Sequence, residues 1–145
     1  MVRAVGSAGS EGEARGPAAR IFTSRYRNRD LARRDDLVKV GITRGRPQFR
    51  TFYEYQWLKL LAPPGWLFSE DDQDIFRRKF RAAVLDPNRE AILGKLGELS
   101  GGGDLVLLCF EDLRQPGAWC HRRIVAEWLE EQDLGPVDEL GEEDR

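Results

Sequence analysis

An unbroken apolar run, Leu105-Val106-Leu107-Leu108-Cys109-Phe110, constrains the fold more than any other segment. A strand with one face in water alternates polar and apolar residues, whereas a strand that is apolar throughout is covered on both faces. The run is also far shorter than the roughly 20 residues that a membrane-spanning helix needs. We therefore expect a buried strand inside a sheet that is covered on both sides.

Weaker strand and helix signals alternate along the rest of the chain. The β-prone segments are residues 21–24, 37–42 and 136–140. Helical spacing of apolar residues is found at residues 52–61, in a helix capped by Ser69, in a second helix that starts at Asp86-Pro87, and from Cys120 to Glu131. Strands that alternate with helices predict a small three-layer, Rossmann-like α/β domain with a mainly parallel sheet.

Length and composition bound the domain organisation. The 145 residues, 41% hydrophobic and 33% charged, suffice for one domain and exclude a membrane or collagen-like protein. Residues 1–19 lack apolar periodicity, so we expect a disordered arm, a single domain at residues 20–140 and a disordered acidic tail at residues 141–145. Two cysteines and one histidine exclude a disulfide scaffold and a conventional zinc finger. No apolar secretory signal opens the chain, so the expected compartment is the cytoplasm and we expect no membrane partner.

The net charge of -2 hides a strong asymmetry. Residues 1–50 carry 12 Lys and Arg against 5 Asp and Glu, whereas residues 124–145 carry 1 against 9. A basic head and an acidic tail indicate either an arm that binds a polyanion or a chain whose two ends pair with each other. We favour the second interpretation, because runs of surface charge are usually solvated faces.

Polar and reactive residues follow the predicted strands. Ligands of open parallel sheets bind beyond the carboxyl ends of the strands. The segments expected there are Ser24-Arg25-Tyr26, Thr43-Arg44-Gly45-Arg46, Cys109-Phe110-Glu111 and the helix start Cys120-His121-Arg122. The sequence therefore predicts one site at this edge of the sheet.

Cys120 is the candidate reactive group of this site. Free N–H groups and the helix dipole at the start of a helix stabilise an anion, either the thiolate itself or a bound phosphate or carboxylate. Arg122 adds positive charge beside it. The alternative is a thiol packed under the sheet edge, with His121 and Arg122 in solvent. The clustering of these residues favours a functional anion site.

The strand end and the first loop supply the other candidates. Cys109 and Glu111 are two residues apart on a strand and should point to the same face. A buried carboxylate needs a partner, which Arg44, Arg46, Arg122 or a bound metal could supply. Cys109 itself is more often a small core residue than a ligand. Arg44 and Arg46 offer two guanidinium groups that suit a planar oxyanion.

Other chemistries are less well supported. Cys109, Glu111, Cys120 and His121 are four potential metal ligands, but adjacent side chains at a helix start diverge by about 100°. The usual two-residue spacing of zinc ligands is also absent, so we expect no metal. A disulfide between Cys109 and Cys120 is conceivable, yet a cytoplasmic setting argues against a permanent one. His121 follows Cys120 directly and is not expected to face it as a base.

At these residues the chain resembles DUF488, a family of bacterial, archaeal and phage proteins classed as a domain of unknown function. The resemblance rests on Leu107-Leu108-Cys109-Phe110-Glu111 followed by Cys120-His121-Arg122, with support from residues 41–47 and from Leu61-Ala62-Pro63. It covers about Ile21 to Glu131. It implies a small Rossmann-like fold with no established activity, and it places the family motif at Cys109, Glu111, Cys120, His121 and Arg122.

We therefore expect a domain that binds or acts on an anionic, phosphate- or nucleotide-like small molecule at the Cys-His-Arg helix start. Cys120 and Glu111 are the catalytic candidates, and the ligand-binding candidates are Arg44, Arg46, Cys109, His121 and Arg122. The sequence identifies no cofactor, reaction or oligomeric state. Two alternatives stay open: a structural or interaction module without catalysis, and a nucleic-acid-associated protein that uses its arginine-rich N-terminal half.

Overall fold

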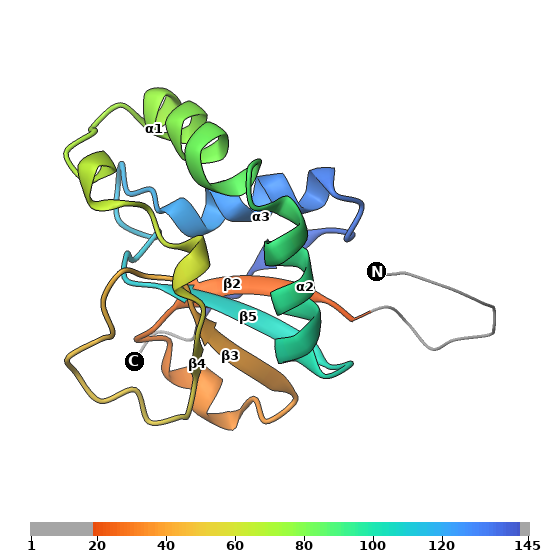
Figure 1. The fold of residues 1–145 in the computed structure, drawn as a ribbon. Coiled ribbons are helices and arrows are strands. Elements are labelled where there is room, and N and C mark those ends of the chain that lie inside the picture. The colour runs from red at the N-terminus through yellow and green to blue at the C-terminus, as the bar shows by residue number, and fades with distance from the viewer. Residues whose placement is uncertain (1–18, 143–145) are drawn as a thin grey trace.

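A five-stranded parallel sheet forms the centre of the protein (Figure 1). The computed structural model describes residues 19–142. The strands are β2 (Ile21–Arg25), β3 (Leu37–Gly41), β4 (Gln56–Trp57), β5 (Asp104–Cys109) and β6 (Val137–Glu139), in the spatial order β4-β3-β5-β2-β6. The predicted apolar run is therefore the central strand, paired with β3 on one side and β2 on the other. The mainly parallel α/β fold is confirmed.

Two hydrophobic clusters cover the two faces of the sheet. The α-helices are α1 (Gln73–Phe80), α2 (Arg89–Ser100) and α3 (His121–Glu131), with a π-helical turn η4 (Arg81–Leu85) after α1. Leu105 and Leu107 pack in the cluster formed with these helices, which lie on the same side of the sheet in Figure 1. Val106 and Leu108 pack in a second cluster with Leu31 of the 3-10 turn η1 (Arg29–Arg33).

Tyrosine and phenylalanine side chains from the long β3–β4 connection complete this second cluster. Phe49, Tyr53 and Tyr55 pack against it. The second outer layer is thus a 3-10 turn and a loop rather than an α-helix. Residues 105–109 of β5 are nevertheless all apolar, because alternate side chains enter one cluster or the other.

The predicted helix over residues 52–61 is wrong. Phe52 has a positive φ of 65°, which a right-handed helix cannot contain, and the segment holds β4 and the 3-10 turn η2 (Lys59–Leu61) instead. Trp57 pairs with Gly41 in the sheet and donates its indole N–H to the carbonyl of Thr43 at 2.8 Å. Pairing with a neighbouring strand outweighs the helical spacing of the apolar residues.

Both predicted helix starts in the middle of the chain move towards the C-terminus. Asp72, not Ser69, caps α1 by accepting the N–H groups of Asp74 and Ile75 at 2.9 and 3.1 Å. The short 3-10 turn η3 (Gly65–Leu67) occupies the segment just before Ser69. Asp86 lies at the end of the π-helical turn, and its carboxylate accepts the indole N–H of Trp128 on α3 at 2.9 Å.

The basic head pairs with the acidic tail. Arg20 forms an ion pair with Asp138, and Arg25 forms a bidentate ion pair with Glu142. Within the predicted acidic tail, the carbonyl of Gly141 also accepts a side-chain N–H of Asn28. The rest of the predicted tail, and the predicted N-terminal arm except residue 19, lie outside the described residues. Across residues 19–142 no helix is both long and apolar enough to cross a membrane.

Candidate functional site

The site lies where the chain leaves two neighbouring strands in opposite directions. From β3 the chain continues to β4 at one edge of the sheet, whereas from β5 it continues through α3 to β6 at the other edge. Such a switch point leaves a crevice at the carboxyl ends of the strands, where ligands of open α/β sheets bind. The predicted placement of the site at this edge agrees with the topology.

A pocket of about 390 Å³ opens at this point. Its buried floor is formed by Thr43 after β3, Cys109 at the end of β5, and Cys120 and His121 at the start of α3. The rim includes the exposed side chains of Phe68, Phe110, Arg44, Asp71 and Glu111, and the partly buried carboxylate of Glu70. A pocket of this size suits a small molecule.

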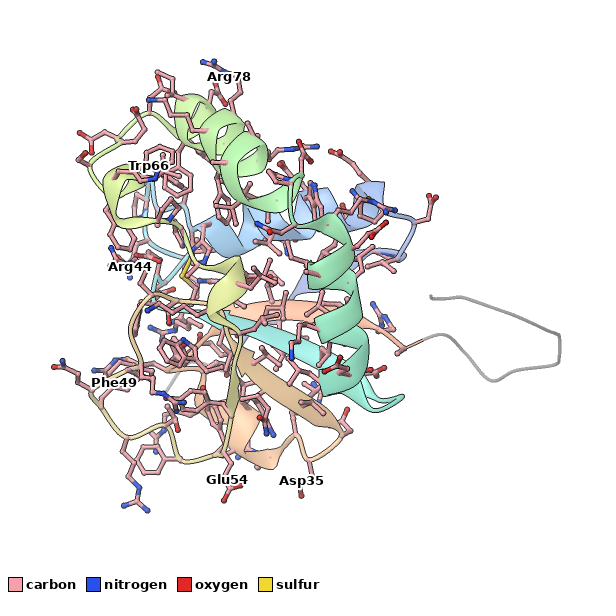
Figure 2. All side chains as sticks on the ribbon, in the orientation of Figure 1. Asp35, Arg44, Phe49, Glu54, Trp66 and Arg78 are labelled. Carbon is pink, nitrogen blue, oxygen red and sulfur yellow. A yellow bond between two sulfur atoms is a disulfide. The ribbon has the colours of Figure 1, made fainter. Side chains whose placement is uncertain are left out.

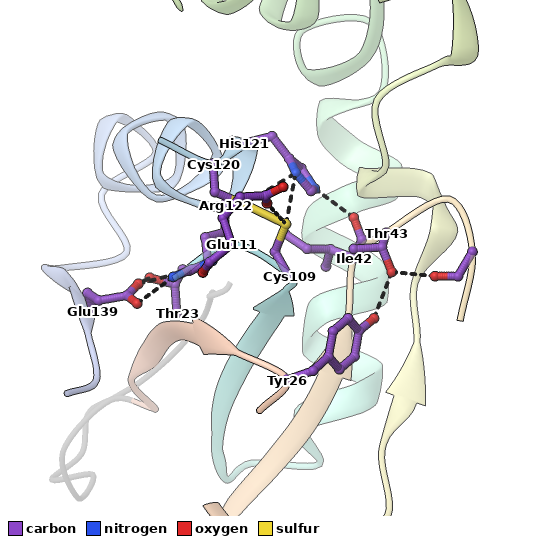
Figure 3. The surroundings of a disulfide bond; sticks show 11 residues. Thr23, Tyr26, Ile42, Thr43, Cys109, Glu111, Cys120, His121, Arg122 and Glu139 are labelled. Carbon is purple, nitrogen blue, oxygen red and sulfur yellow. Dashed lines mark hydrogen bonds and ion pairs between the residues drawn. A yellow bond between two sulfur atoms is a disulfide. The ribbon is translucent and has the colours of Figure 1, made fainter. Parts of the chain in front are cut away.

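The two cysteines are joined by a disulfide on the pocket floor (Figure 3). Cys109 ends β5, and Cys120 is the residue that caps the N-terminus of α3. The bond ties the central strand directly to the helix that follows it. Both cysteines are buried and both belong to the pocket lining.

His121 turns one ring nitrogen towards the sulfur atoms. Its Nε2 lies 2.7 Å from the carbonyl oxygen of Ile42, so Nε2 carries the proton and donates it. The unprotonated Nδ1 lies 3.4 Å from the Sγ of Cys109 and 3.7 Å from the Sγ of Cys120. Burial lowers the pKa of His121 to about 4, so the ring is neutral at pH 7.

The Nδ1 acceptor has an unusual environment. His121 is only 7% exposed, and in the described part of the chain the two sulfur atoms are its only hydrogen-bond contacts. Neither sulfur of a disulfide carries a hydrogen. A buried acceptor is therefore aimed at two atoms that can satisfy it only after the disulfide is reduced.

The extended backbone of Cys120 brings its side chain next to that of His121. Cys120 has φ -147° and ψ 147°, so it precedes the helix instead of belonging to its first turn. The divergence of about 100° holds only between two helical residues. The expectation that these adjacent side chains point apart is therefore wrong, and the argument against a shared metal or proton contact loses its basis.

Glu111 lies at the rim, as the spacing on the strand predicts. Its Oε1 is 3.2 Å from the Sγ of Cys109, which places both side chains on the same side. The carboxylate is exposed, so it does not need the cationic partner that a buried carboxylate would. In the reduced protein the thiol of Cys109 can donate a hydrogen bond to this oxygen.

Arg122 is a structural residue in this geometry. Its side chain is completely buried, and it donates two hydrogen bonds to the carboxylate of Glu139, at 3.0 and 2.8 Å, and one to the carbonyl of Glu111 at 2.9 Å. These bonds connect the pocket loop to the edge strand β6. The expected role of Arg122 in clamping an anion is not what the structure shows, because a ligand in the pocket cannot reach the guanidinium.

Arg44 and Arg46, the two arginines of the loop after β3, lie in different surroundings. Arg44 lines the pocket, with its guanidinium 5.5 Å from the ring of Phe68. Arg46 is outside the pocket lining and lies over the ring of Trp57 at 4.7 Å. Figure 2 shows Arg44 on the edge of the molecule that also carries Trp66 and Phe49. Of the three expected guanidinium groups, one faces the pocket.

The sequence did not predict Phe76 and Trp119 in the pocket, whereas Thr43 lies in a segment that was predicted at this site. The hydroxyl of Thr43 donates its hydrogen to the carbonyl of Gly45 and accepts a hydrogen bond from the buried Tyr26 hydroxyl at 2.7 Å. These two bonds hold the loop over the pocket floor. Burial raises the pKa of Tyr26 to about 12, so this hydroxyl stays neutral. Trp119 and Phe76 form an edge-to-face pair at the pocket wall, with ring centroids 5.0 Å apart. No local motif marks these residues, because only the tertiary fold brings them together.

Comparison with known proteins gives one match. The sequence model of a family described as the active DUF488-N3 subclade matches residues 5–133. The chain belongs to this family. The resemblance to DUF488 expected from the cysteine and histidine motif is thereby confirmed, although the match does not test the motif itself. Neither the search of the curated proteins nor that of the solved structures found a match for this DUF488-N3 chain.

Proposed function

We propose that this DUF488-N3 domain binds or acts on an anionic small molecule of phosphate- or nucleotide-like chemistry in the pocket, with reduced Cys120 as the reactive group. The observation that carries the proposal is the position of Cys120, which is the residue immediately before the first turn of α3 and lines the pocket. At this position a thiol is stabilised as a thiolate by the N–H groups of the first helical turn. A bound anionic group at the same place has the same stabilisation.

Charge around the pocket restricts where the anion can lie. Arg44 is the guanidinium at the rim, and three carboxylates share the rim with it. The carboxylate of Glu70 accepts the N–H of Asp72 and pairs with Lys79, so it is engaged by the start of α1. The anionic group is therefore best placed deep in the pocket, between Arg44 and the first turn of α3.

The reduced form supplies the chemistry. A Cys120 thiolate forms a bond to an electrophilic atom of the ligand, and the leaving group departs with the bonding electron pair. Neutral His121 is an acceptor for a thiol hydrogen, and exposed Glu111 is the group at the rim that can exchange protons with the ligand. Because the proposal needs free thiols, it fits the cytoplasm, where reductants keep thiols reduced.

The test uses a Cys109→Ser variant, which leaves Cys120 as the single thiol. We measure the rate of alkylation of this thiol as a function of pH. We expect this rate to report a thiol pKa well below the ordinary value of about 8.5. Cys120→Ser is the control for reaction at the other cysteine. A ligand that occupies the pocket at about 100 times its dissociation constant stabilises the protein by about 2.7 kcal/mol. We therefore expect inorganic phosphate or a nucleotide to raise the melting temperature of the reduced protein.

The two loop arginines provide a matched pair for the same test. Arg44→Ala should abolish the rise in melting temperature, whereas Arg46→Ala should leave it unchanged, because only Arg44 lines the pocket. An ordinary thiol at Cys120 together with no thermal shift from phosphate or nucleotides would reject the proposal. That result would favour the structural or interaction module, in which the motif only ties β5 to α3.

A second candidate function rests on the β3–β4 loop. Arg50 lies over the ring of Phe52 at 5.2 Å, and Phe52 is 63% exposed. Arg27 lies over Phe49 at 3.9 Å. Exposed aromatic rings beside arginines are the groups that stack bases and neutralise phosphates of single-stranded nucleic acid. Salt-sensitive binding of a labelled single-stranded oligonucleotide, lost in Phe52→Ala, would support this function over the small-molecule site.

A further inference from the structure

We propose that reduction of the disulfide turns Cys109, Cys120 and His121 into a binding site for one zinc ion, with the fourth coordination position open to the pocket. The three ligand atoms are the two Sγ atoms and the Nδ1 of His121. These atoms all lie within 4.8 Å of one another, and all three residues are buried. The inference does not rest on the proposed function, because it requires no anionic ligand and no thiol attack.

The distances match tetrahedral coordination. Zinc binds thiolate sulfur at about 2.3 Å and imidazole nitrogen at about 2.0–2.1 Å, so a tetrahedral sulfur–nitrogen edge is roughly 3.6 Å. The two sulfur–nitrogen distances here are 3.4 and 3.7 Å. The two sulfur atoms need to separate to roughly 3.8 Å, the corresponding sulfur–sulfur edge, and breaking the covalent bond between them permits this.

His121 has the tautomer and orientation of a metal ligand. A ligating histidine normally donates its other ring N–H to a carboxylate or a backbone carbonyl, which orients the ring. Here Nε2 donates to the carbonyl of Ile42 at 2.7 Å, and the lone pair of Nδ1 faces the two sulfurs (Figure 3). This buried acceptor has no donor in the disulfide form, as shown above, and a metal ion would satisfy it.

The surroundings suit a zinc ion with an open position. Two thiolates and a neutral imidazole around Zn²⁺ carry no net charge, so the buried floor accommodates the filled site without an unpaired charge. The pocket provides access from solvent and room for a fourth ligand. Three protein ligands and an open position are typical of zinc sites that bind water or substrate. Glu111, 3.2 Å from one sulfur, lies beside that position.

Electrons and protons balance with one named co-reactant. A small-molecule or protein dithiol, or a phosphine in vitro, supplies two electrons to the disulfide, and two protons convert its sulfurs to thiols. Zinc binding then releases these two protons, whereas neutral His121 releases none. The metal and an alkylating reagent use the same Cys120 sulfur, so zinc is expected to protect Cys120 from alkylation.

The test is a cobalt titration of the full chain, reduced with a phosphine under anaerobic conditions. We expect one Co²⁺ per chain, with thiolate-to-cobalt charge transfer in the near ultraviolet and the visible bands of tetrahedral cobalt, both removed by Zn²⁺. About two protons should be released per ion below the pH at which the thiols ionise. The oxidised chain should show none of these signals. No stoichiometric binding by the reduced chain would overturn the proposal.

Four variants identify the ligands. Cys109→Ser and Cys120→Ser should each roughly halve the charge-transfer intensity and weaken binding by more than about tenfold. His121→Gln keeps an N–H for the Ile42 carbonyl but loses the Nδ1 ligand, and should weaken binding similarly. Asp71→Asn removes an exposed carboxylate of the rim, is the matched control, and should bind cobalt like the unaltered protein. Circular dichroism of each metal-free variant checks that it is folded.

The outcomes separate this inference from the proposed function. Unaltered binding by His121→Gln, or a loss in Asp71→Asn as large as in His121→Gln, would overturn the three-ligand site with an open position. The thiol and ligand assays of the proposed function are made with a chelator present, so they can succeed or fail whatever the metal result is. Zinc binding with no phosphate or nucleotide binding would leave this inference intact and reject the other.

Discussion

The neutrality of His121 predicts a specific loss of stability in mild acid. Its pKa is lowered from 6.5 to about 4 by burial, so between these values the unfolded chain binds a proton that the folded chain excludes. Stability is therefore greatest above the unfolded value and falls as the pH drops from 6.5 towards 4. With these two pKa values, lowering the pH from about 7.5 to about 5 removes about 2 kcal/mol of the free energy of unfolding.

Few other groups of the chain titrate between about pH 5 and pH 7.5. His121 is the single histidine of the 145-residue chain, and ordinary carboxylates titrate mainly below about pH 5. The assay is urea unfolding of the oxidised, metal-free protein at several pH values, with His121→Gln measured in parallel. The variant keeps a donor for the Ile42 carbonyl and has no group that titrates in the window. A flat profile for the unaltered protein, or an equal slope in the variant, would refute the reasoning.

Three further substitutions test separate features by the same unfolding measurement. Arg122→Ala removes the buried guanidinium that pairs with the partly exposed carboxylate of Glu139 and should cost about 1–3 kcal/mol; an unchanged stability would contradict this interaction. Gly41→Ala places a methyl group against the buried Tyr26 hydroxyl and should cost about 1–3 kcal/mol, whereas an unchanged midpoint would show that this contact relaxes freely. Gly97→Ala, on an open part of α2, should stabilise the protein by about 1 kcal/mol, and a loss would contradict the absence of neighbours there.

The central strand could be predicted because its burial on both faces produces a continuous run of apolar residues. The apolar run from Leu105 fits a strand that is covered on both faces, and its residues up to Cys109 lie in the central strand, whereas Phe110 is exposed beyond it. The segment around Phe52 lacked such a constraint. Its apolar spacing satisfies a helix, but a positive φ at Phe52 and pairing of Trp57 with Gly41 decided the outcome. Both depend on contacts that are distant in sequence.

The location of the site in the fold could be predicted from the sequence, but the orientation of its side chains could be predicted only in part. Cys109 and Cys120 were expected at the same sheet edge, and the structure joins them there. Arg122 was expected to bind a ligand, because it adds positive charge beside Cys120 at the start of the helix. Its burial follows from Glu139 on β6, a partner 17 residues away that nothing in the local sequence connects to it.

The environment of His121 stabilises the reduced form of the site relative to the disulfide form. In the folded protein at neutral pH its Nδ1 is buried and unprotonated, because the Ile42 carbonyl accepts the N–H of Nε2. Against the disulfide this acceptor has no donor, and a buried polar atom without a partner costs about 1–3 kcal/mol. A thiol hydrogen removes that cost in the reduced form, and a metal ion removes it with a stronger interaction. The surrounding residues thus favour the reduced site over the oxidised one, which is the form that both the thiol chemistry and the zinc site require.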